Sequence, residues 1–242
     1  MTFKRQTMSE TECAICGDTA SSAEIYPAAV AADGVLKRGR IVRCDRCGLM
    51  RTDPAADASF THPREAAALR NAYRRALERV LQLGAGTGAL LDVGDGSLLE
   101  HARAAAFARV TGVAATLHAG MFPDATFDVV CLSGVLDRIA DPRACLYASV
   151  DVLKPGGYLL AMTDNIDGVF ARLLGRRSPI FDAAHTFFYS PKTLATLARR
   201  TGLDVVSARS AAKIVPLSPR LSLPLPLGSL QLIGRKPGRL QR

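Results

Sequence analysis

The sequence predicts an α/β protein, in which a doubly wound, mostly parallel sheet follows a small cysteine-bearing unit. Three observations lead to this prediction. Strand-like apolar runs alternate with helical segments from about residue 83 onward. A turn with two glycines comes directly after the first clear strand of that region, around residues 89–93. Two Cys-x-x-Cys pairs lie within residues 13–47, ahead of the alternation.

The composition is that of a folded chain with a sizeable core. Of the 242 residues, 48% are hydrophobic and 22% are charged, whereas a disordered chain would be less apolar and more charged. No window holds 18 uninterrupted apolar residues, and the first residues lack the apolar core of a signal peptide. We therefore expect a soluble, cytoplasmic protein without a transmembrane segment.

The chain is basic, with 31 Lys and Arg against 22 Asp and Glu, a net charge of +9. Such a charge can attract nucleic acid, a membrane surface or a phosphate-bearing substrate. The basic residues are scattered through an Ala-rich chain and form no block, which favours a solvated surface over a dedicated anion site. We therefore expect no nucleic-acid partner, although a zinc-ribbon module that binds nucleic acid stays open as an alternative.

Four cysteines form the sharpest chemical pattern: Cys13, Cys16, Cys44 and Cys47. Each pair occupies one tight turn and is followed by a glycine, which permits the positive φ that such a turn often needs. Two such turns supply four soft thiolates, which suit a tetrahedral zinc ion whose positions are all filled by protein. Disulfides or a redox pair are the alternatives, but a redox pair normally opens a helix of a thioredoxin-like unit.

The pattern of composition divides the chain into three segments. Residues 1–55 form the expected zinc-ribbon domain, which is too small to fold by burial alone and would need its metal. Residues 56–82 turn to Ala, Arg and Glu with helical periodicity, so we expect a helical linker. Residues 83–242 form the α/β domain. Four prolines within 214–227 predict a loop between its last two strands.

Residues 89–113 have the order strand, glycine turn, helix, strand with which a nucleotide-binding unit begins. Gly94 and Gly96 would let a ligand approach the backbone, and the following helix presents free N–H groups. A second glycine run, 84–88, offers a rival position for this turn. It would place the segment LLDVGDG inside a helix, where two glycines are unfavourable. We therefore expect the ligand at Gly94.

Several segments together resemble the class I S-adenosylmethionine-dependent methyltransferases, in the branch with an amino-terminal four-cysteine zinc ribbon. CAICG and RCDRCGLMRTDP resemble the ribbon, and LLDVGDGS resembles the cofactor loop. FPDATFDVV, GVLDRIADP and LKPGGYLLAMTDN are similar to the region of the fourth and fifth strands, and HTFFYSPKTLATLARRTGLDV and GSLQLIGRKP to the last part of the family's fold. The resemblance covers nearly the whole chain. It implies a Rossmann-like sheet and methyl transfer from S-adenosylmethionine to a small-molecule or sugar-type acceptor.

The resemblance also assigns roles to individual residues. Those expected at the cofactor are Asp92, Gly94, Gly96, Ser97 and Ser133. Asp137 and His185 stand where the family places acidic and imidazole groups, and they are the catalytic candidates. Each also has a structural interpretation, because a lone histidine beside aromatic residues is often a packing residue and an aspartate often begins a helix.

Three departures from the family pattern suggest a different role for the same fold. The third glycine of the cofactor loop is absent, with Leu98 near its position. The second strand is followed by Ala114, where the family usually has a carboxylate for the ribose, and loss of that contact costs about 2 to 4 kcal/mol. A helix and much of the third strand are also missing after Ala114. A methyltransferase-fold scaffold or partner-binding protein without catalysis is therefore the alternative function.

Overall fold

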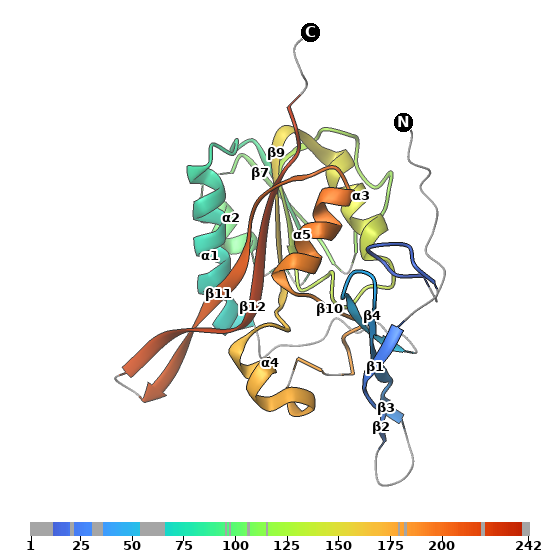
Figure 1. Ribbon diagram of the computed structural model, residues 1–242. Helices are drawn as coiled ribbons and strands as arrows, with labels where there is room; N and C mark the ends of the chain where they lie inside the picture. The colour runs from blue at the N-terminus through green and yellow to red at the C-terminus, as the bar shows by residue number, and fades with distance from the viewer. Residues whose placement is uncertain are drawn as a thin grey trace.

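The structure is a computed structural model of the 242-residue chain. It describes residues 12–19, 22–30, 36–53, 66–94, 96, 98–105, 107–114, 116–178, 180–181, 183–218 and 221–238. A six-stranded sheet with helices on both faces forms the body, and a four-stranded sheet lies near one end of it (Figure 1). Within the described residues, no helix has the length and apolar character needed to span a membrane.

The six-stranded sheet is mostly parallel, as the sequence predicts. Neighbouring strands follow the order β11-β12-β9-β8-β6-β7, and the four strands β6 to β9 pair in parallel. Only β12 runs against its two neighbours. The strand bounds are β6 Ala89–Gly94, β7 Arg109–Val113, β8 Phe127–Ser133, β9 Leu153–Asp164, β11 Asp204–Ser218 and β12 Leu221–Arg235.

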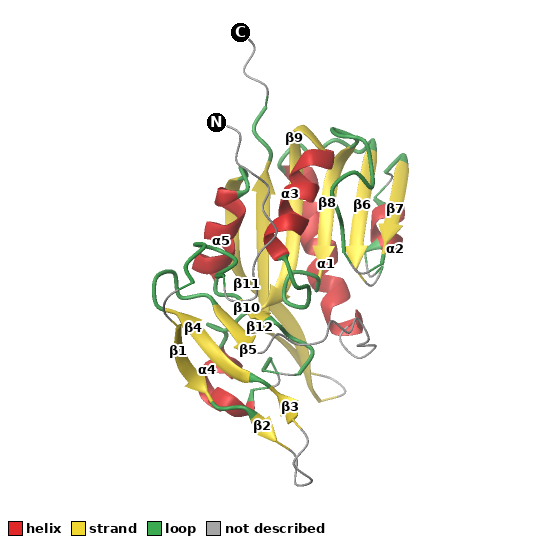
Figure 2. Ribbon diagram, turned by 90° about the vertical axis from the view of Figure 1, so that its right-hand side faces the viewer, coloured by secondary structure: helices red, strands yellow, loops and turns green. Residues whose placement is uncertain are grey.

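Helices cover both faces of this sheet, so the doubly wound prediction is confirmed (Figure 2). Alternate residues of a strand point to opposite faces. Leu90 therefore packs in one apolar cluster with α1 and α2, whereas Leu91 packs in the other with α3 and α5. The helix bounds are α1 Ala66–Gln82, α2 Leu99–Ala104, α3 Pro142–Val152 and α5 Pro191–Arg200. Ser190 caps α5 as predicted, with Pro191 at its first turn.

The sheet ends at β7, as the short sequence between the second and fourth family strands predicts. In the part of the chain that the structure describes, no strand pairs with the outer edge of β7. The described residues between β7 and β8 form turns and irregular backbone. The outer edge of β7 is therefore not covered by any described strand.

The amino-terminal strands build the expected β-ribbon, but they do not form its sheet alone. The order β1-β4-β5-β10 joins three early strands to Phe187–Phe188, which lies far along the chain. Phe187 is paired with Arg51 and Phe188 with Met50. The other bounds are β1 Ser22–Tyr26, β4 Arg40–Cys44, β5 Met50–Asp53, and β2 Ala29–Val30 with β3 Leu36–Arg38 as a separate pair.

The predicted linker is described from Ala66 onward, as helix α1, and residues 54–65 lie outside the described part. Tyr73, Leu77 and Val80 of α1 are buried against the six-stranded sheet. The helix is therefore one of the layers that cover the sheet. The three-segment division of the chain stays a prediction.

The prediction of a loop over 214–227 is wrong for its described part. β11 and β12 continue as an antiparallel hairpin that projects from the body, with Lys213 paired to Leu225 and Ser218 to Leu221 (Figure 1). Proline lacks an N–H group for the strand ladder, but it is tolerated at edges and bulges. A two-stranded arm consists only of edges, so Pro216 and Pro224 fit within it. Beyond β9 the chain forms helix α4, Val169–Leu174, and the short helix η1, Gly175–Arg177.

Thr52 of β5 holds the segment that leads into β10, because its N–H donates to the carbonyl of Thr186 and its Oγ1 donates to the carbonyl of His185, both at 2.8 Å. We expect Thr52→Val to lower the free energy of unfolding by about 1 to 3 kcal/mol, since it leaves the buried His185 carbonyl without that donor. Urea denaturation measures the change. Thr196→Val is the control, because Thr196 bonds only the exposed Lys192 carbonyl of its own helix. Equal losses in both variants would contradict the prediction.

Candidate functional site

The glycine turn after β6 brings the ends of two strands together. Gly94 has φ +132°, and a Cβ atom there would lie 2.5 Å from the carbonyl oxygen of Ser133. Gly96 follows with φ +78°. Glycine is thus required at position 94 because the backbone at the end of β8 is so close. The turn lies at the carboxyl ends of parallel strands, where α/β sheets bind their ligands.

Asp92 holds the turn in place from inside the sheet. Its side chain is 1% exposed, and its Oδ1 accepts a hydrogen bond of 3.2 Å from Ser133 Oγ. Its Oδ2 accepts one of 3.3 Å from the N–H of Leu98, at the start of α2. The structure therefore brings four of the five predicted cofactor residues together, namely Asp92, Gly94, Gly96 and Ser133. Ser97 lies outside the described residues.

The rival glycine run, residues 84–88, lies just before β6, at the opposite end of that strand from the Gly94 turn. A Cβ atom on Gly86 would lie 2.6 Å from Asp128 Oδ1, and one on Gly88 would lie 2.8 Å from Asp128 Oδ2. The same carboxylate accepts hydrogen bonds from the Ala89 N–H and from Lys154 Nζ, each at 2.8 Å. These two glycines are therefore explained by close packing around Asp128, which supports the Gly94 turn as the ligand position.

A pocket opens directly beside the Gly94 turn. It encloses about 290 Å³ of space, part of it open to solvent, and Gly134 in its wall is the residue after Ser133. Polar atoms of its wall that are buried without a hydrogen-bond partner include Asp137 Oδ1, Thr163 Oγ1 and Ser229 Oγ. Buried polar atoms are normally paired, so these three mark a place for a polar ligand. The lining residues are Tyr73, Gly134, Asp137, Arg138, Met162, Thr163, Asp164 and Ser229.

The two catalytic candidates of the sequence, Asp137 and His185, lie side by side and buried. His185 Nε2 is 3.6 Å from Asp137 Oδ2, and the exposed fractions are 3% for His185 and 4% for Asp137. The backbone fixes the pair, because the carbonyl of Asp137 accepts hydrogen bonds from the N–H groups of Thr186 and Phe187. The interpretation of Asp137 as a residue of a helix's first turn is wrong, because α3 begins only at Pro142.

The charges around His185 favour its protonated form. Burial alone would lower the pKa of His185, but the negative charges of Asp137 and Asp164 raise it, as does the hydrogen bond to the Ile180 carbonyl. The net effect is a pKa above the ordinary value of histidine. Asp164 is a member of this group that sequence reasoning missed. Its position at the end of β9 is the one signal that could have indicated it.

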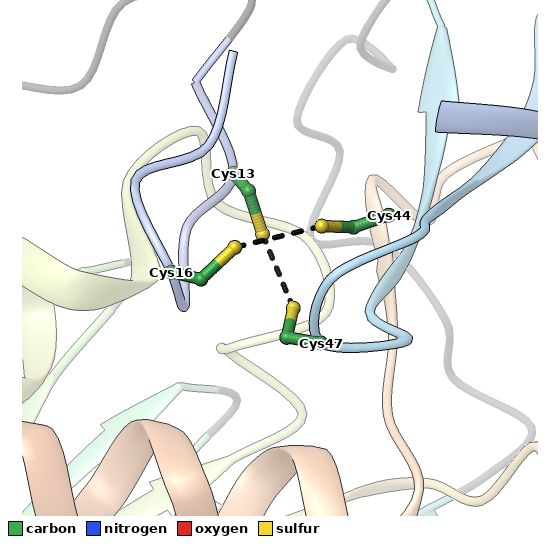
Figure 3. Close-up of side chains that lie close together, drawn as sticks. All are labelled: Cys13, Cys16, Cys44 and Cys47. Atoms are coloured by element: carbon green, nitrogen blue, oxygen red, sulfur yellow. Dashed lines mark hydrogen bonds between the residues drawn. The ribbon is translucent and has the colours of Figure 1, made fainter. Parts of the chain in front are cut away.

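The four cysteines come together as predicted, on two turns that face each other (Figure 3). Cys13 Sγ lies 3.4 Å from Cys47 Sγ, and Cys16 Sγ lies 3.5 Å from Cys44 Sγ. All four are free thiols, since a disulfide would need about 2.05 Å. Zinc–sulfur bonds of about 2.3 Å in a tetrahedron place sulfurs about 3.8 Å apart. The donor set therefore fits a zinc-sized ion closely.

The backbone and the charges of the cysteine cluster support this fit. Gly17 and Gly48, which follow the two pairs, have φ of +69° and +78°, as the sequence predicts. Hydrogen bonding with Cys47 lowers the pKa of Cys13 to about 5, whereas burial raises that of Cys16 to about 11. The bond with Cys13 raises the pKa of Cys47 well above its usual value. The thiols of Cys13, Cys16 and Cys47 therefore do not all ionise together without a cation.

The cysteine turns are anchored to the helices of the body. Arg200 of α5 donates a hydrogen bond of 2.6 Å to the carbonyl of Ile15, and Arg143 of α3 pairs with Glu12 at 3.1 Å. Ile15 also belongs to the same buried apolar cluster as Tyr189. The metal candidate thus lies beside α3 and α5.

A family model described as a methyltransferase domain matches residues 60–208, which is more than half of the chain. The match begins after the cysteine cluster. A search of the curated proteins gave no match. Residues 60–208 contain the Gly94 turn and the Asp137 and His185 pair.

Solved structures of methyltransferases share the fold. One is a SAM-dependent methyltransferase from Archaeoglobus fulgidus, with a TM-score of 0.52 and 17% identity, over 69% of this chain and 94% of that one. Another is described as a putative sarcosine dimethylglycine methyltransferase from Galdieria sulphuraria, with a TM-score of 0.51 and 12% identity, over 76% of this chain and 95% of that one. At such identities the likeness concerns the fold alone.

The close approach of Gly94 to the carbonyl of Ser133 leads to a prediction about stability. We expect Gly94→Ala to lower the free energy of unfolding by about 2 to 5 kcal/mol, because the new Cβ meets a backbone carbonyl and the positive φ is strained as well. Gly134→Ala is the matched control, since its φ is +62° but no atom lies within 4 Å of the new Cβ. Denaturation with urea measures both variants, and an equal loss would show that strain alone matters.

Proposed function

The chain belongs to the methyltransferase domain family, and we propose that it transfers a methyl group from S-adenosylmethionine to a small-molecule or sugar-type acceptor. The observation that carries this proposal is the polar pocket that opens directly beside the Gly94 turn. A cofactor at the turn and an acceptor in the pocket would be neighbours. Holding two reactants in a productive orientation accounts for much of the rate in such a transfer.

The residues at the Gly94 turn suit the cofactor, whereas the end of β7 does not. Asp92, Gly94, Gly96 and Ser133 would hold it, with Ser97 as a further candidate by position. When bound, S-adenosylmethionine supplies an electrophilic methyl group on its sulfonium. The buried Asp92 offers negative charge, and its bonds to Ser133 and Leu98 keep it in place without a ligand. The end of β7 lacks the ribose carboxylate, so we expect weaker binding than in relatives that have it.

The pocket fits an acceptor with polar groups. Thr163 Oγ1 and Ser229 Oγ are free to bond it, and the walls from Asp137 and Arg138 offer charges of both signs. His185 and Asp137 are the groups that we propose to contact the reacting atom. The pocket is narrow, so only a small polar group of the acceptor would enter it.

Titration calorimetry with S-adenosylhomocysteine tests this proposal. We expect saturable binding that Asp92→Asn weakens about tenfold or more. We also expect Ala114→Asp to tighten binding about tenfold or more, because it restores a carboxylate at the end of β7 for the ribose hydroxyls. Ala28→Asp makes the same charge change at an exposed residue of the amino-terminal unit and should have no effect. Circular dichroism confirms that each variant is folded.

The absence of heat and of any thermal shift at millimolar ligand, in the wild type and in Ala114→Asp alike, would contradict the enzyme proposal. The scaffold alternative would then be favoured, and a partner protein would have to be found. Binding that Ala114→Asp does not improve would leave the enzyme proposal in place. It would show that the ribose lies elsewhere than at the end of β7.

We propose that the four cysteines bind one structural zinc ion, since no coordination position is left for water or substrate. Metal analysis by mass spectrometry should find one zinc per chain in the wild type and less than a tenth of that in Cys44→Ser. Cys145→Ala is the control, because Cys145 is a buried thiol of α3 that does not belong to the group of four. We expect Cys44→Ser to lose ordered structure around β4 and β5 as well, because the ion stabilises the fold. Full zinc content in Cys44→Ser would contradict the proposal.

A further inference from the structure

Asp137 and His185, which the proposed function places at the reacting atom, form one buried cluster with Asp164. Ligand atoms of Asp137, Asp164 and His185 all lie within 4.8 Å of one another. The three residues come from the turn after β8, the end of β9 and the segment before β10. We propose that they bind a divalent cation of the Mn²⁺ or Fe²⁺ type, to which an oxygen of the acceptor coordinates. The role toward the acceptor rests on the proposed function, whereas binding of the ion does not.

The imidazole of His185 has the orientation of a metal ligand. Nδ1 lies 2.8 Å from the carbonyl oxygen of Ile180. A carbonyl only accepts, so Nδ1 carries the proton, and in the neutral ring the lone pair is on Nε2. A bond from one ring nitrogen to a backbone carbonyl is the usual support of a metal-bound histidine. Nε2 is the atom that faces Asp137, and it is buried without a hydrogen-bond partner.

The distances suit a shared ion better than a direct hydrogen bond. His185 Nε2 and Asp137 Oδ2 are 3.6 Å apart, which is too long for a hydrogen bond. Two ligands that each lie about 2.1 to 2.2 Å from one ion are about 3.0 to 3.6 Å apart, depending on the angle between them. Two carboxylates and one imidazole are a mixed oxygen and nitrogen set, which suits first-row divalent ions.

Buried polar atoms beside the cluster point independently to a ligand. Thr163 Oγ1 and Ser229 Oγ have no hydrogen-bond partner, although their residues are 7% and 1% exposed. They line the same pocket as Asp137 and Asp164. Buried polar atoms are normally paired, because leaving them unpaired is unfavourable. Water or an acceptor oxygen in this pocket, next to the cation, would give these hydroxyls a partner.

The surrounding charges set the strength of the site. With neutral His185, the two carboxylates bring a charge of about −2 to the cluster, which a divalent ion balances. Arg138 lines the same pocket, and its positive charge opposes the ion. The competing arrangement is an ion pair between protonated His185 and Asp137, which needs no metal. The two arrangements exclude each other because Nε2 has a single lone pair.

Titration of the zinc-loaded, full-length protein with Mn²⁺ tests the proposal, with electron paramagnetic resonance to measure the free ion. Prior zinc loading occupies the four cysteines. We expect one Mn²⁺ per chain, bound at least tenfold more weakly by Asp164→Asn and by His185→Gln. Asp124→Asn, which removes an exposed carboxylate from a turn, should bind as the wild type does. Asp164 is only partly buried, so its variant is expected to fold.

The outcomes separate this proposal from the proposed function. Absent Mn²⁺ binding, or binding that is equal in all four proteins, would overturn the metal site. Nitrogen NMR of His185 would then show both ring nitrogens protonated, as the ion pair requires. S-adenosylhomocysteine binding is measured on the same samples. A wild type that binds Mn²⁺ but not S-adenosylhomocysteine would contradict the methyltransferase function and leave the metal site in place.

Discussion

The structure depends on one short extended segment, residues 185–188, which is bound from two sides. On one side, Thr52 of β5 donates to the carbonyls of His185 and Thr186. On the other, the N–H groups of Thr186 and Phe187 donate to the carbonyl of Asp137. The cysteine-bearing unit, the catalytic histidine candidate and the turn after β8 therefore form one continuous hydrogen-bonded assembly. The backbone of His185 cannot shift without breaking bonds to β5 or to Asp137.

This junction gives the distant cysteine cluster an influence on the pocket. The second pair, Cys44 and Cys47, links β4 to β5, and the N–H of Cys44 bonds the carbonyl of Leu49 just before β5. An ion at the cluster would order this turn, β5 would then be ordered, and β5 holds His185 through Thr52. The structural zinc ion that we propose would thus contribute to the geometry of a site whose atoms it does not touch, and its loss would impair the pocket as well as the amino-terminal unit.

Sequence reasoning succeeded where a pattern is local and failed where contacts are distant in the chain. The alternating runs and the Cys-x-x-Cys spacing predicted the parallel sheet and the grouping of the cysteines, because both are repeated local signals. β10 has only two residues, so it has no periodicity to detect, and its pairing with β5 could not be foreseen. Asp164 was missed for the same reason, since nothing in its local sequence relates it to His185. The arm of β11 and β12 was misjudged because prolines argue against central strands and say less about a free hairpin.

The adenosine side and the acceptor side of the site differ, and this difference helps to decide between an enzyme and a scaffold. The side expected to hold the adenosine has lost features, since β7 ends the described sheet and Ala114 stands where a carboxylate would bind the ribose. The acceptor side has kept buried polar atoms without partners on Asp137, Thr163 and Ser229. Each reduces stability by about 1 to 3 kcal/mol, and apolar replacements would remove that cost. A pure scaffold gains nothing from such atoms, whereas an enzyme needs them for its acceptor, so the pocket favours the enzyme over the scaffold.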